Sequence, residues 1–184
     1  MKVKHPTKEE CLKMLDEYNT PAHVVRHCVA VADTALKIAE ALNDKGFDFN
    51  ITLITSAALL HDIARVEEKH WISGADFALR NGYLQEAKII RRHMTHSLDP
   101  DAAKLKELDL VCLGDRLVLE DRYVGIDKRM DYVIEKARGD KKIEKMIIAR
   151  KEENKRLIRN IEDIIGVSID ELILNGAGSE ADEY

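Results

Sequence analysis

The stretch ITLITSAALLHDIA, residues 51–64, decides the fold of this chain. Its first ten residues are almost all apolar or small, and such a run is typical of a buried strand or a buried helix. The length of the run and its Ala-Ala-Leu-Leu centre favour a helix, which we expect to continue to about Ala64. His61 and Asp62 interrupt what should be the driest segment of the protein.

The segments on either side of this run also have helical signals. Thr7 and Glu10 have the spacing of a capping box, and Thr20 before Pro21 predicts a second helix start with threonine as the cap. A serine, Ser73, is expected to open a later short helix. Apolar spacing predicts helices over about 7–18, 21–43, 51–64, 73–81, 84–94, 108–119, 127–137 and 140–165, with essentially no strands.

The composition agrees with a single helical domain. The chain has 184 residues, of which 45% are hydrophobic, 34% charged and only 5% aromatic. This length is enough for a hydrophobic core, and we find no repeat or linker. We therefore predict one all-α domain over residues 1–184, a bundle of about seven to nine helices. We expect its core at about 20–125, packing helices at 127–174 and a flexible tail at 175–184.

The charge and the cysteines exclude several classes of protein. The net charge is −5, so the chain lacks the basic surface that nucleic acids require. The amino-terminal segment has no apolar core and no run reaches membrane-spanning length, so we expect a cytoplasmic protein without membrane contact. Cys11, Cys28 and Cys112 are odd in number and widely spaced, which argues against disulfides and against a structural zinc site.

Several polar side chains fall on faces that the apolar pattern predicts to be buried. His27 lies four residues before Val31, and Asp115 shares a helical face with Val111. A buried carboxylate or imidazole is unfavourable unless it is paired, hydrogen-bonded or bound to metal. Each residue alone has an ordinary explanation, such as an ion pair of Asp115 with a neighbouring arginine. The residues on such faces or helix ends are His27, His61, Asp62, His93 and Asp115, and His70 precedes the helix that contains Gly74 and Ala75.

Helical bundles form metal sites where inward-pointing ligands of several helices converge. Mixed imidazole and carboxylate ligands suit iron, manganese, cobalt, nickel and zinc. Adjacent residues of a helix project about 100° apart. His61 and Asp62 can therefore approach one ion from two sides, or Asp62 can bridge two ions.

The order His27, His61-Asp62, Asp115 resembles the H…HD…D signature of the HD-domain superfamily of metal-dependent phosphohydrolases. The surrounding sequences HCVAVADTALKIA (27–39), AALLHDIAR (57–65) and LVCLGDRL (110–117) also resemble the family's motifs. The segments HWISGA (70–75) and IIRRH (89–93) are similar to the extra histidine positions of members that bind two metals. The resemblance covers about residues 20–125.

The resemblance implies an all-α fold and one or two divalent ions, namely iron, manganese, nickel, cobalt, magnesium or zinc. It also implies hydrolysis of a phosphate ester or anhydride in a small metabolite or nucleotide by water that the metals activate. Carried over by position, the ligands of one ion are His27, His61, Asp62 and Asp115, and those of a second ion are His70, His93 and the bridging Asp62.

Arg65 is the remaining candidate for a catalytic role beside Asp62. It lies four residues after His61 and three after Asp62, so it projects over the same helical face. We predict that it contacts a phosphate of the substrate. The alternative is a salt bridge with Glu68 or Asp62.

The resemblance does not fix the substrate. One branch of the superfamily cleaves dinucleoside tetraphosphates, and there small residues usually follow the fourth histidine. Here Met94-Thr95-His96 follows His93, which departs from that pattern. Three other functions stay open: a non-catalytic regulatory module that binds nucleotide and metal, a di-iron oxygenase and a purely structural bundle. The expected partner is a small phosphorylated substrate, and the charged helix at 140–165 is a candidate for homodimer contacts.

Overall fold

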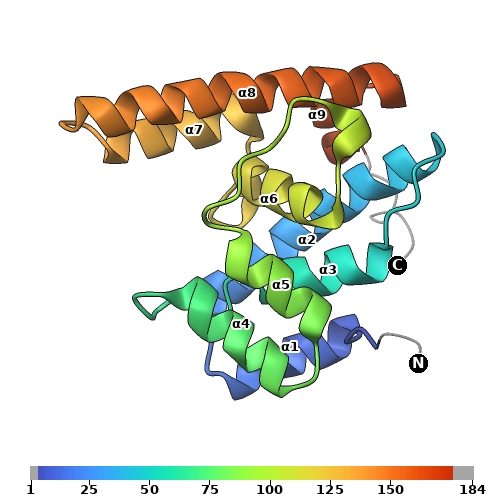
Figure 1. Cartoon of the computed structure of the whole chain (residues 1–184), viewed down its shortest axis with the longest axis vertical. Helices are drawn as coiled ribbons and strands as arrows, with labels where there is room; N and C mark the ends of the chain where they lie inside the picture. Colours follow the sequence, from blue (N-terminus) through green and yellow to red (C-terminus); the bar gives the residue numbers. More distant parts are fainter. Residues whose placement is uncertain (1–3, 176–184) are drawn as a thin grey trace, which may run out of the picture.

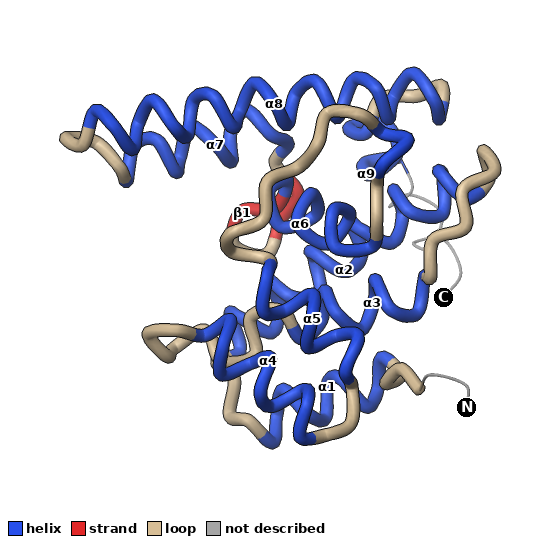
Figure 2. The backbone as a smooth tube through the Cα atoms, viewed as in Figure 1, coloured by secondary structure: helices blue, strands red, loops and turns tan. Residues whose placement is uncertain are grey.

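The computed structural model describes residues 4–175, and these form an all-α bundle, as predicted (Figures 1 and 2). In chain order the elements are α1 (Lys8–Glu17), α2 (Ala22–Asn43), α3 (Ile51–Leu60), α4 (His70–Arg80), α5 (Leu84–Arg92), the 3₁₀ turn η1 (Ala102–Lys104), α6 (Glu107–Leu117), β1 (Val118–Leu119), β2 (Arg122–Tyr123), α7 (Gly125–Lys136), α8 (Lys141–Ile165) and α9 (Ile169–Asn175). No helix within residues 4–175 is both long and apolar enough to cross a bilayer. The predicted tail falls outside the described residues except for Asn175, which ends α9.

Helix α3 is the centre of the fold. It contacts α1, α2, α5 and α6, and residues 56–60 are almost completely buried. Because neighbours surround α3, its sequence is nearly continuously apolar instead of amphipathic. The predicted extension to Ala64 is wrong. After Leu60 the chain tightens into turns, in which Ile63 donates to the Leu60 carbonyl and Arg65 to that of Asp62.

Of the two helix caps predicted from the sequence, one is present and the other is not. The capping box of Thr7 and Glu10 is present in both directions, as predicted. Thr20, however, does not cap α2; Pro21 occupies that position without a side-chain hydrogen bond. The Thr20 hydroxyl donates instead to the Ile63 carbonyl at 2.8 Å. This bond ties the α1–α2 connection to the turns that follow α3.

Helices α4 and α5 form a hairpin that packs against the other side of those turns (Figure 1). The predicted start of α4 at Ser73 is wrong, because the helix begins three residues earlier at His70. Gly74 lies where α4 meets its neighbours: a Cβ there would be 3.1 Å from a methyl of Ile63 and 3.3 Å from a methyl of Ile90. The missing side chain lets α4 approach both segments closely.

The carboxy-terminal part forms a layer across one end of the bundle (Figure 1). Helix α6 ends at Leu117 and not at Leu119 as predicted, because β1 pairs with β2 in a two-residue antiparallel hairpin. Helices α7 and α8 then run side by side. Helix α8 buries a stripe of its residues, namely Ile147, Asn154, Leu157, Ile161 and Ile165. Helix α9 contacts α2.

Candidate metal centre

Three side chains from α2, the end of α3 and α6 form a first cluster. His27, His61 and Asp115 each offer a ligand atom, and these atoms lie within 4.8 Å of one another. His27 Nε2 lies 3.2 Å from Asp115 Oδ1, and His61 Nε2 lies 4.0 Å from the same oxygen. We call this cluster the outer triad, because the side chains of His27 and Asp115 are 15% and 26% exposed.

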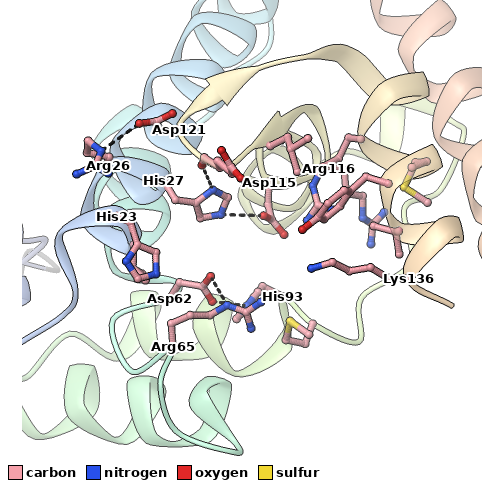
Figure 3. A pocket seen from close by; sticks show the side chains of 18 of the residues that line it. His23, Arg26, His27, Asp62, Arg65, His93, Asp115, Arg116, Asp121 and Lys136 are labelled. Atoms are coloured by element: carbon pink, nitrogen blue, oxygen red, sulfur yellow. Dashed lines mark hydrogen bonds and ion pairs between the residues drawn. The ribbon is translucent and has the colours of Figure 1, made fainter.

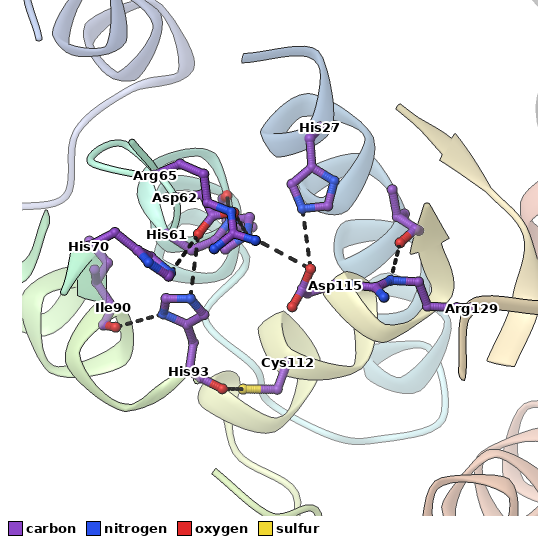
Figure 4. A network of polar contacts seen from close by, with 12 residues as sticks. His27, His61, Asp62, Arg65, His70, Ile90, His93, Cys112, Asp115 and Arg129 are labelled. Atoms are coloured by element: carbon purple, nitrogen blue, oxygen red, sulfur yellow. Dashed lines mark hydrogen bonds and ion pairs between the residues drawn. The ribbon is translucent and has the colours of Figure 1, made fainter. Parts of the chain in front are cut away.

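A second cluster lies beside the first, toward α4 and α5. Asp62, His70 and His93 are all buried, and their ligand atoms also lie within 4.8 Å of one another. His70 Nε2 is 3.1 Å and His93 Nε2 is 3.6 Å from Asp62 Oδ1. We call this cluster the inner triad. Figure 4 shows the two imidazoles converging on Asp62, with His27 facing Asp115 on the other side.

The Asp62 carboxylate lies between the two triads. Its Oδ1 faces the inner imidazoles, and its Oδ2 lies 3.7 Å from His61 Nε2 of the outer triad. Asp62 is not among the three side chains of the outer triad whose ligand atoms lie within 4.8 Å of one another; it belongs to the inner triad and faces the outer one through Oδ2.

Backbone carbonyls orient three of the histidines. The Nδ1 atom of His61 lies 2.7 Å from the Ala58 carbonyl, and that of His93 lies 2.7 Å from the Ile90 carbonyl. The Nδ1 atom of His27 lies 2.6 Å from a third carbonyl, that of residue 120. Because a carbonyl only accepts, each Nδ1 must carry the proton. In a neutral ring Nε2 then has a lone pair available for a cation.

The Nε2 atoms of His61, His70 and His93 are buried and have no hydrogen-bond partner. His70 lies at ion-pair distance from Asp62, but not in hydrogen-bond geometry. Buried polar atoms without partners are rare and destabilising. Here the lone pairs of His61 and His93 face carboxylate oxygens, an arrangement that a cation would satisfy. The residues present therefore fit a metal ion.

The electrostatics also favour a cation. Burial alone would raise the pKa of Asp62, but His61 and the inner imidazoles hold that pKa well below its usual range. Burial likewise opposes ionisation of Asp115, whose pKa is nevertheless lowered by its contact with His27. Desolvation lowers the pKa of His61 in spite of both carboxylates. Burial opposes protonation of His27, but its contact with Asp115 raises the pKa of this ring, so a bound cation would have to displace that proton. Anionic carboxylates and neutral imidazoles are the protonation states that bind metals.

A close helix–helix approach brings Asp115 to His27. A Cβ on Gly114 would lie 3.0 Å from the Val31 carbonyl oxygen and 3.1 Å from the Ala35 Cβ. Only glycine therefore lets α6 approach α2 at this distance. The ligand on α6 and the ligand on α2 can share one ion because the residue beside Asp115 has no side chain.

A cavity of about 700 Å³ opens from the outer triad (Figure 3). His27 and Asp115 form part of its wall, together with Asp62 and His93. His61 and His70 do not reach it, since they lie deeper. Each triad thus contributes two side chains to the cavity wall, but His27 and Asp115 of the outer triad are more exposed to this space than Asp62 and His93.

Arg65 lies at the edge of this cavity. Its Nε is 3.3 Å from Asp62 Oδ2, and half of its side chain is exposed. The predicted alternative of a salt bridge with Asp62 is thus present, whereas Glu68 is not a partner among the ion pairs of residues 4–175. The remaining guanidinium N–H groups are available to a ligand.

The arginine that follows Asp115 in the sequence has other partners. Arg116 donates to Asn154 Oδ1 at 3.0 Å and also to the His96 carbonyl, so it does not pair with Asp115. Arg92 and Arg122 are not part of the cavity wall. Asp115 instead forms a hydrogen bond with His27, which is also a member of the outer triad.

The remaining histidines lie outside both triads. His23 lines the cavity but belongs to neither triad. His5 contacts Glu86 at 2.7 Å, and His96 contacts Asp109 at 2.5 Å. These two contacts stabilise the packing away from the centre.

The cations that α7 and α8 contribute to the cavity wall were not predicted. Arg129, Lys136 and Arg150 come from α7 and α8. Their sequence surroundings gave no signal, because charged residues recur along both helices and a cation facing a cavity has the same pattern as one facing solvent.

The fold is an all-α bundle, and two histidine–aspartate triads lie beside its cavity. This arrangement is typical of helical metal-binding proteins. Residues 24–120, more than half of the chain, match the family model of the HD domain. The chain therefore belongs to the HD-domain family, which confirms the family predicted from the order of His27, His61-Asp62 and Asp115. HD domains bind divalent metals, and the family groups with metal-dependent phosphohydrolases.

The relatives do not specify the activity. An uncharacterized protein of Methanocaldococcus jannaschii is 32% identical over 85 residues, which cover 44% of this chain and 50% of that protein. A tRNA (cytidine(56)-2'-O)-methyltransferase of Thermoplasma volcanium is 29% identical over 102 residues, 53% of this chain and 29% of the relative. Its namesake from Picrophilus torridus is 25% identical over 142 residues, 68% of this chain and 40% of the relative. The chain thus spans half or less of these curated relatives, and no solved structure matches it.

Proposed function

We propose that the chain is a metal-dependent phosphohydrolase that cleaves a phosphate ester or anhydride bond of a small phosphorylated molecule. The observation that carries this proposal is the outer triad, whose ligand candidates face a cavity. Catalytic metal sites keep a position open for water and substrate, whereas structural sites are closed. The cavity of about 700 Å³ is within the usual size range for small-molecule sites.

The ligand assignment follows the two clusters. His27, His61 and Asp115 would hold one ion together with Asp62, and His70 and His93 would hold a second ion that shares Asp62. The distances and the position of the Asp62 oxygens support this assignment. The mixture of imidazole and carboxylate favours iron, manganese, cobalt, nickel or zinc over magnesium.

Divalent ions bound in this way supply an activated water molecule and neutralise charge on phosphoryl oxygens. The protein contributes orientation and exclusion of water. The carbonyl partners of His61 and His93 fix the two rings, and burial of the inner triad keeps water from that side. Arg65 donates its remaining N–H groups to the phosphoryl group and positions it beside the outer triad.

The second candidate is a non-catalytic module that binds metal and nucleotide. The two tRNA methyltransferases favour it, since they are longer proteins of which the matched segment makes up 29% and 40%. A segment of that kind can serve a larger enzyme without hydrolysing anything itself.

One experiment separates these functions. Purified protein is analysed for metals and then screened under nitrogen against phosphorylated metabolites and nucleotides with added manganese, cobalt or nickel. We expect one or two metal equivalents and release of phosphate or nucleotide. Nucleotide that stays intact on a metal-loaded protein would support the binding module. A strict requirement for oxygen would point to an oxygenase, and a complete absence of metal to a structural bundle.

A further inference from the structure

The cavity wall contributed by α7 and α8 lies outside the segment that matches the family model, which ends at residue 120. The residues of these helices that line the cavity are Arg129, Met130, Tyr132, Val133, Lys136, Ile147 and Arg150. None of them is acidic. Figure 3 shows the Lys136 side chain extending into the cavity, toward the side where Asp115 and His93 lie.

Most cations of the cavity already have partners. Arg26 pairs with Asp121 at 3.0 Å, and Arg129 donates to the carbonyl of residue 118 at 2.8 Å. Arg65 and Arg116 have the partners described above. These four side chains are held by the protein itself, so they have fewer donors left for a ligand.

Lys136 and Arg150 are the exceptions. Within residues 4–175 neither takes part in an ion pair or a side-chain hydrogen bond, although both line the cavity. Lys136 Nζ lies 4.4 Å from the ring centroid of Tyr132, a contact that orients the ammonium group but leaves its N–H donors free. Two cations without acidic partners on one wall create a positive potential that attracts an anion.

The neighbourhood of Arg150 strengthens this potential. Arg116 lines the same cavity as Arg150 and is held there by Asn154 and the His96 carbonyl. Like charges close together at a partly buried wall repel, and an anion bound between them would relieve that repulsion. The wall that α7 and α8 contribute to the cavity therefore has an excess of positive charge.

The cavity also has an apolar part. Side chains from α2, β1, α7 and α8 contribute to it, together with one after α5; they are Val24, Met94, Leu119, Met130, Val133 and Ile147. A ligand that fills the cavity therefore has an organic portion as well as charge. Two cationic side chains match the two negative charges of a phosphoryl group better than the single charge of a carboxylate.

We propose that Lys136 and Arg150 bind a second phosphoryl group of the substrate, so that the protein selects small molecules with two phosphoryl groups over monophosphates. This inference rests on the proposed function. One phosphoryl group lies at the outer triad, the other at the α7–α8 wall, and the organic portion contacts the apolar side chains. Lys136 and Arg150 are then specificity residues and take no part in the bond cleavage.

The test is equilibrium binding by calorimetry to the full chain loaded with manganese. The probes are AMP, with one phosphoryl group, and ADP and adenosine 3',5'-bisphosphate, with two in different arrangements; their integrity is checked afterwards. The variant is K136Q together with R150Q. The matched control is K128Q together with R156Q, which removes one lysine and one arginine from exposed positions of the same helices that do not line the cavity.

We expect one or both of the two-phosphoryl probes to bind the parent more tightly than AMP by a factor of about ten or more, because one charged contact alone contributes roughly tenfold. The K136Q/R150Q protein should lose this preference with unchanged metal content and helical circular dichroism, whereas the control keeps it. R150K should retain part of it. Because chelation of manganese by a probe is the same for every variant, the difference between variants reports the wall itself.

Equal affinity of the parent for all three probes, or a preference that survives in K136Q/R150Q, would overturn the inference. The proposed hydrolysis is judged separately. A preference that depends on Lys136 and Arg150 without turnover of any phosphorylated compound would support the inference and contradict hydrolysis. Turnover without the preference would support hydrolysis and contradict the inference. A protein that takes up no metal would overturn both the inference and the proposed hydrolysis.

Discussion

The inner and outer triads contain the same ligand types, two histidines and one aspartate, in different surroundings. In the inner triad the side chains of His70, His93 and Asp62 are 4%, 2% and 9% exposed. In the outer triad His61 is also buried, at 1%, but His27 and Asp115 are 15% and 26% exposed, and each triad contributes two side chains to the cavity wall. The α4–α5 hairpin contributes two inner ligands, whereas the outer ligands come from α2, α6 and the end of α3.

The comparison shows that the types of ligand alone do not determine whether a bound ion is structural or catalytic. A closed site favours a structural ion, and a site with open access favours a catalytic ion. We therefore expect the outer ion to meet the substrate. The inner ion would mainly hold Asp62 and the α4–α5 hairpin in place.

The largest effect is expected for D62N, since Asp62 faces both triads. The variant should lose most of its metal and about a thousandfold in activity, because several kcal/mol of charge stabilisation disappear. Elemental analysis and phosphate release measure the two quantities. D163N, the same change on the exposed face of α8, should match the parent. Full metal content in D62N would mean that the two triads are independent.

D115N should act on the outer triad alone. We expect about one metal equivalent fewer and activity reduced about a hundredfold, with the inner ion retained. The measurement is metal content together with kcat at saturating manganese. If D115N loses both equivalents, the triads form a single cooperative site and the distinction between them is wrong.

H70Q should act on the inner triad alone, because His70 does not reach the cavity. We expect one equivalent fewer and a loss of about tenfold in kcat, because the inner ion would orient Asp62 and would not meet the substrate. The decisive quantity is the ratio of kcat values for H70Q and D115N. Equal losses in the two variants would refute separate roles.

Removal of metal should lower the thermal midpoint of the parent by about 5–10 °C, as expected for a ligand present at about a hundred times its dissociation constant. The buried Nε2 atoms lose their cation, which destabilises the α4–α5 side. Calorimetry with and without chelator measures the shift. Most of this shift in the thermal midpoint should be absent in H70Q, whereas D115N should retain much of it. A shift that is lost in D115N and retained in H70Q would mean that the outer ion, and not the inner one, stabilises the fold.

R65Q should have the smallest effect. Arg65 is half exposed and its ion pair with Asp62 is partly screened by solvent, so the pair contributes at most about 1 kcal/mol. We expect unchanged metal content and KM raised about threefold to fivefold at constant kcat. R91Q is the control, because Arg91 is similarly exposed and pairs with Asp76 away from the cavity. A large loss of metal in R65Q would make Arg65 part of the centre.

Most of the fold could be predicted because the apolar periodicity is strong. The run at 51–64 was correctly predicted as a buried helix, but its end was placed at Ala64 instead of Leu60. An apolar pattern does not distinguish a helix from tight turns buried in the same core. Thr20 shows the same limit, since a hydroxyl with cap spacing bonds to a distant carbonyl, that of Ile63, which no local rule identifies.

Five of the six proposed ligands could be named from the sequence because a polar residue on a buried face is unfavourable without a partner. The sixth, His70, was named as a ligand from the resemblance to the HD-domain family. Their role as ligands stays a prediction, although the structure brings them into two clusters. Lys136 and Arg150 could not be named in this way. Cations on a charged amphipathic helix have no local feature that separates a cavity wall from solvent.

The sequence by itself determined that the chain is helical, which faces are buried and which acids and imidazoles lie on them, because these properties follow from residue type and spacing along one helix. Only the tertiary structure decided which residues share a triad, which triad opens to the cavity and which cations line the opposite wall. These properties depend on how closely separate helices approach, as Gly114 permits for α6 and α2, and spacing along one helix carries no information on its neighbours.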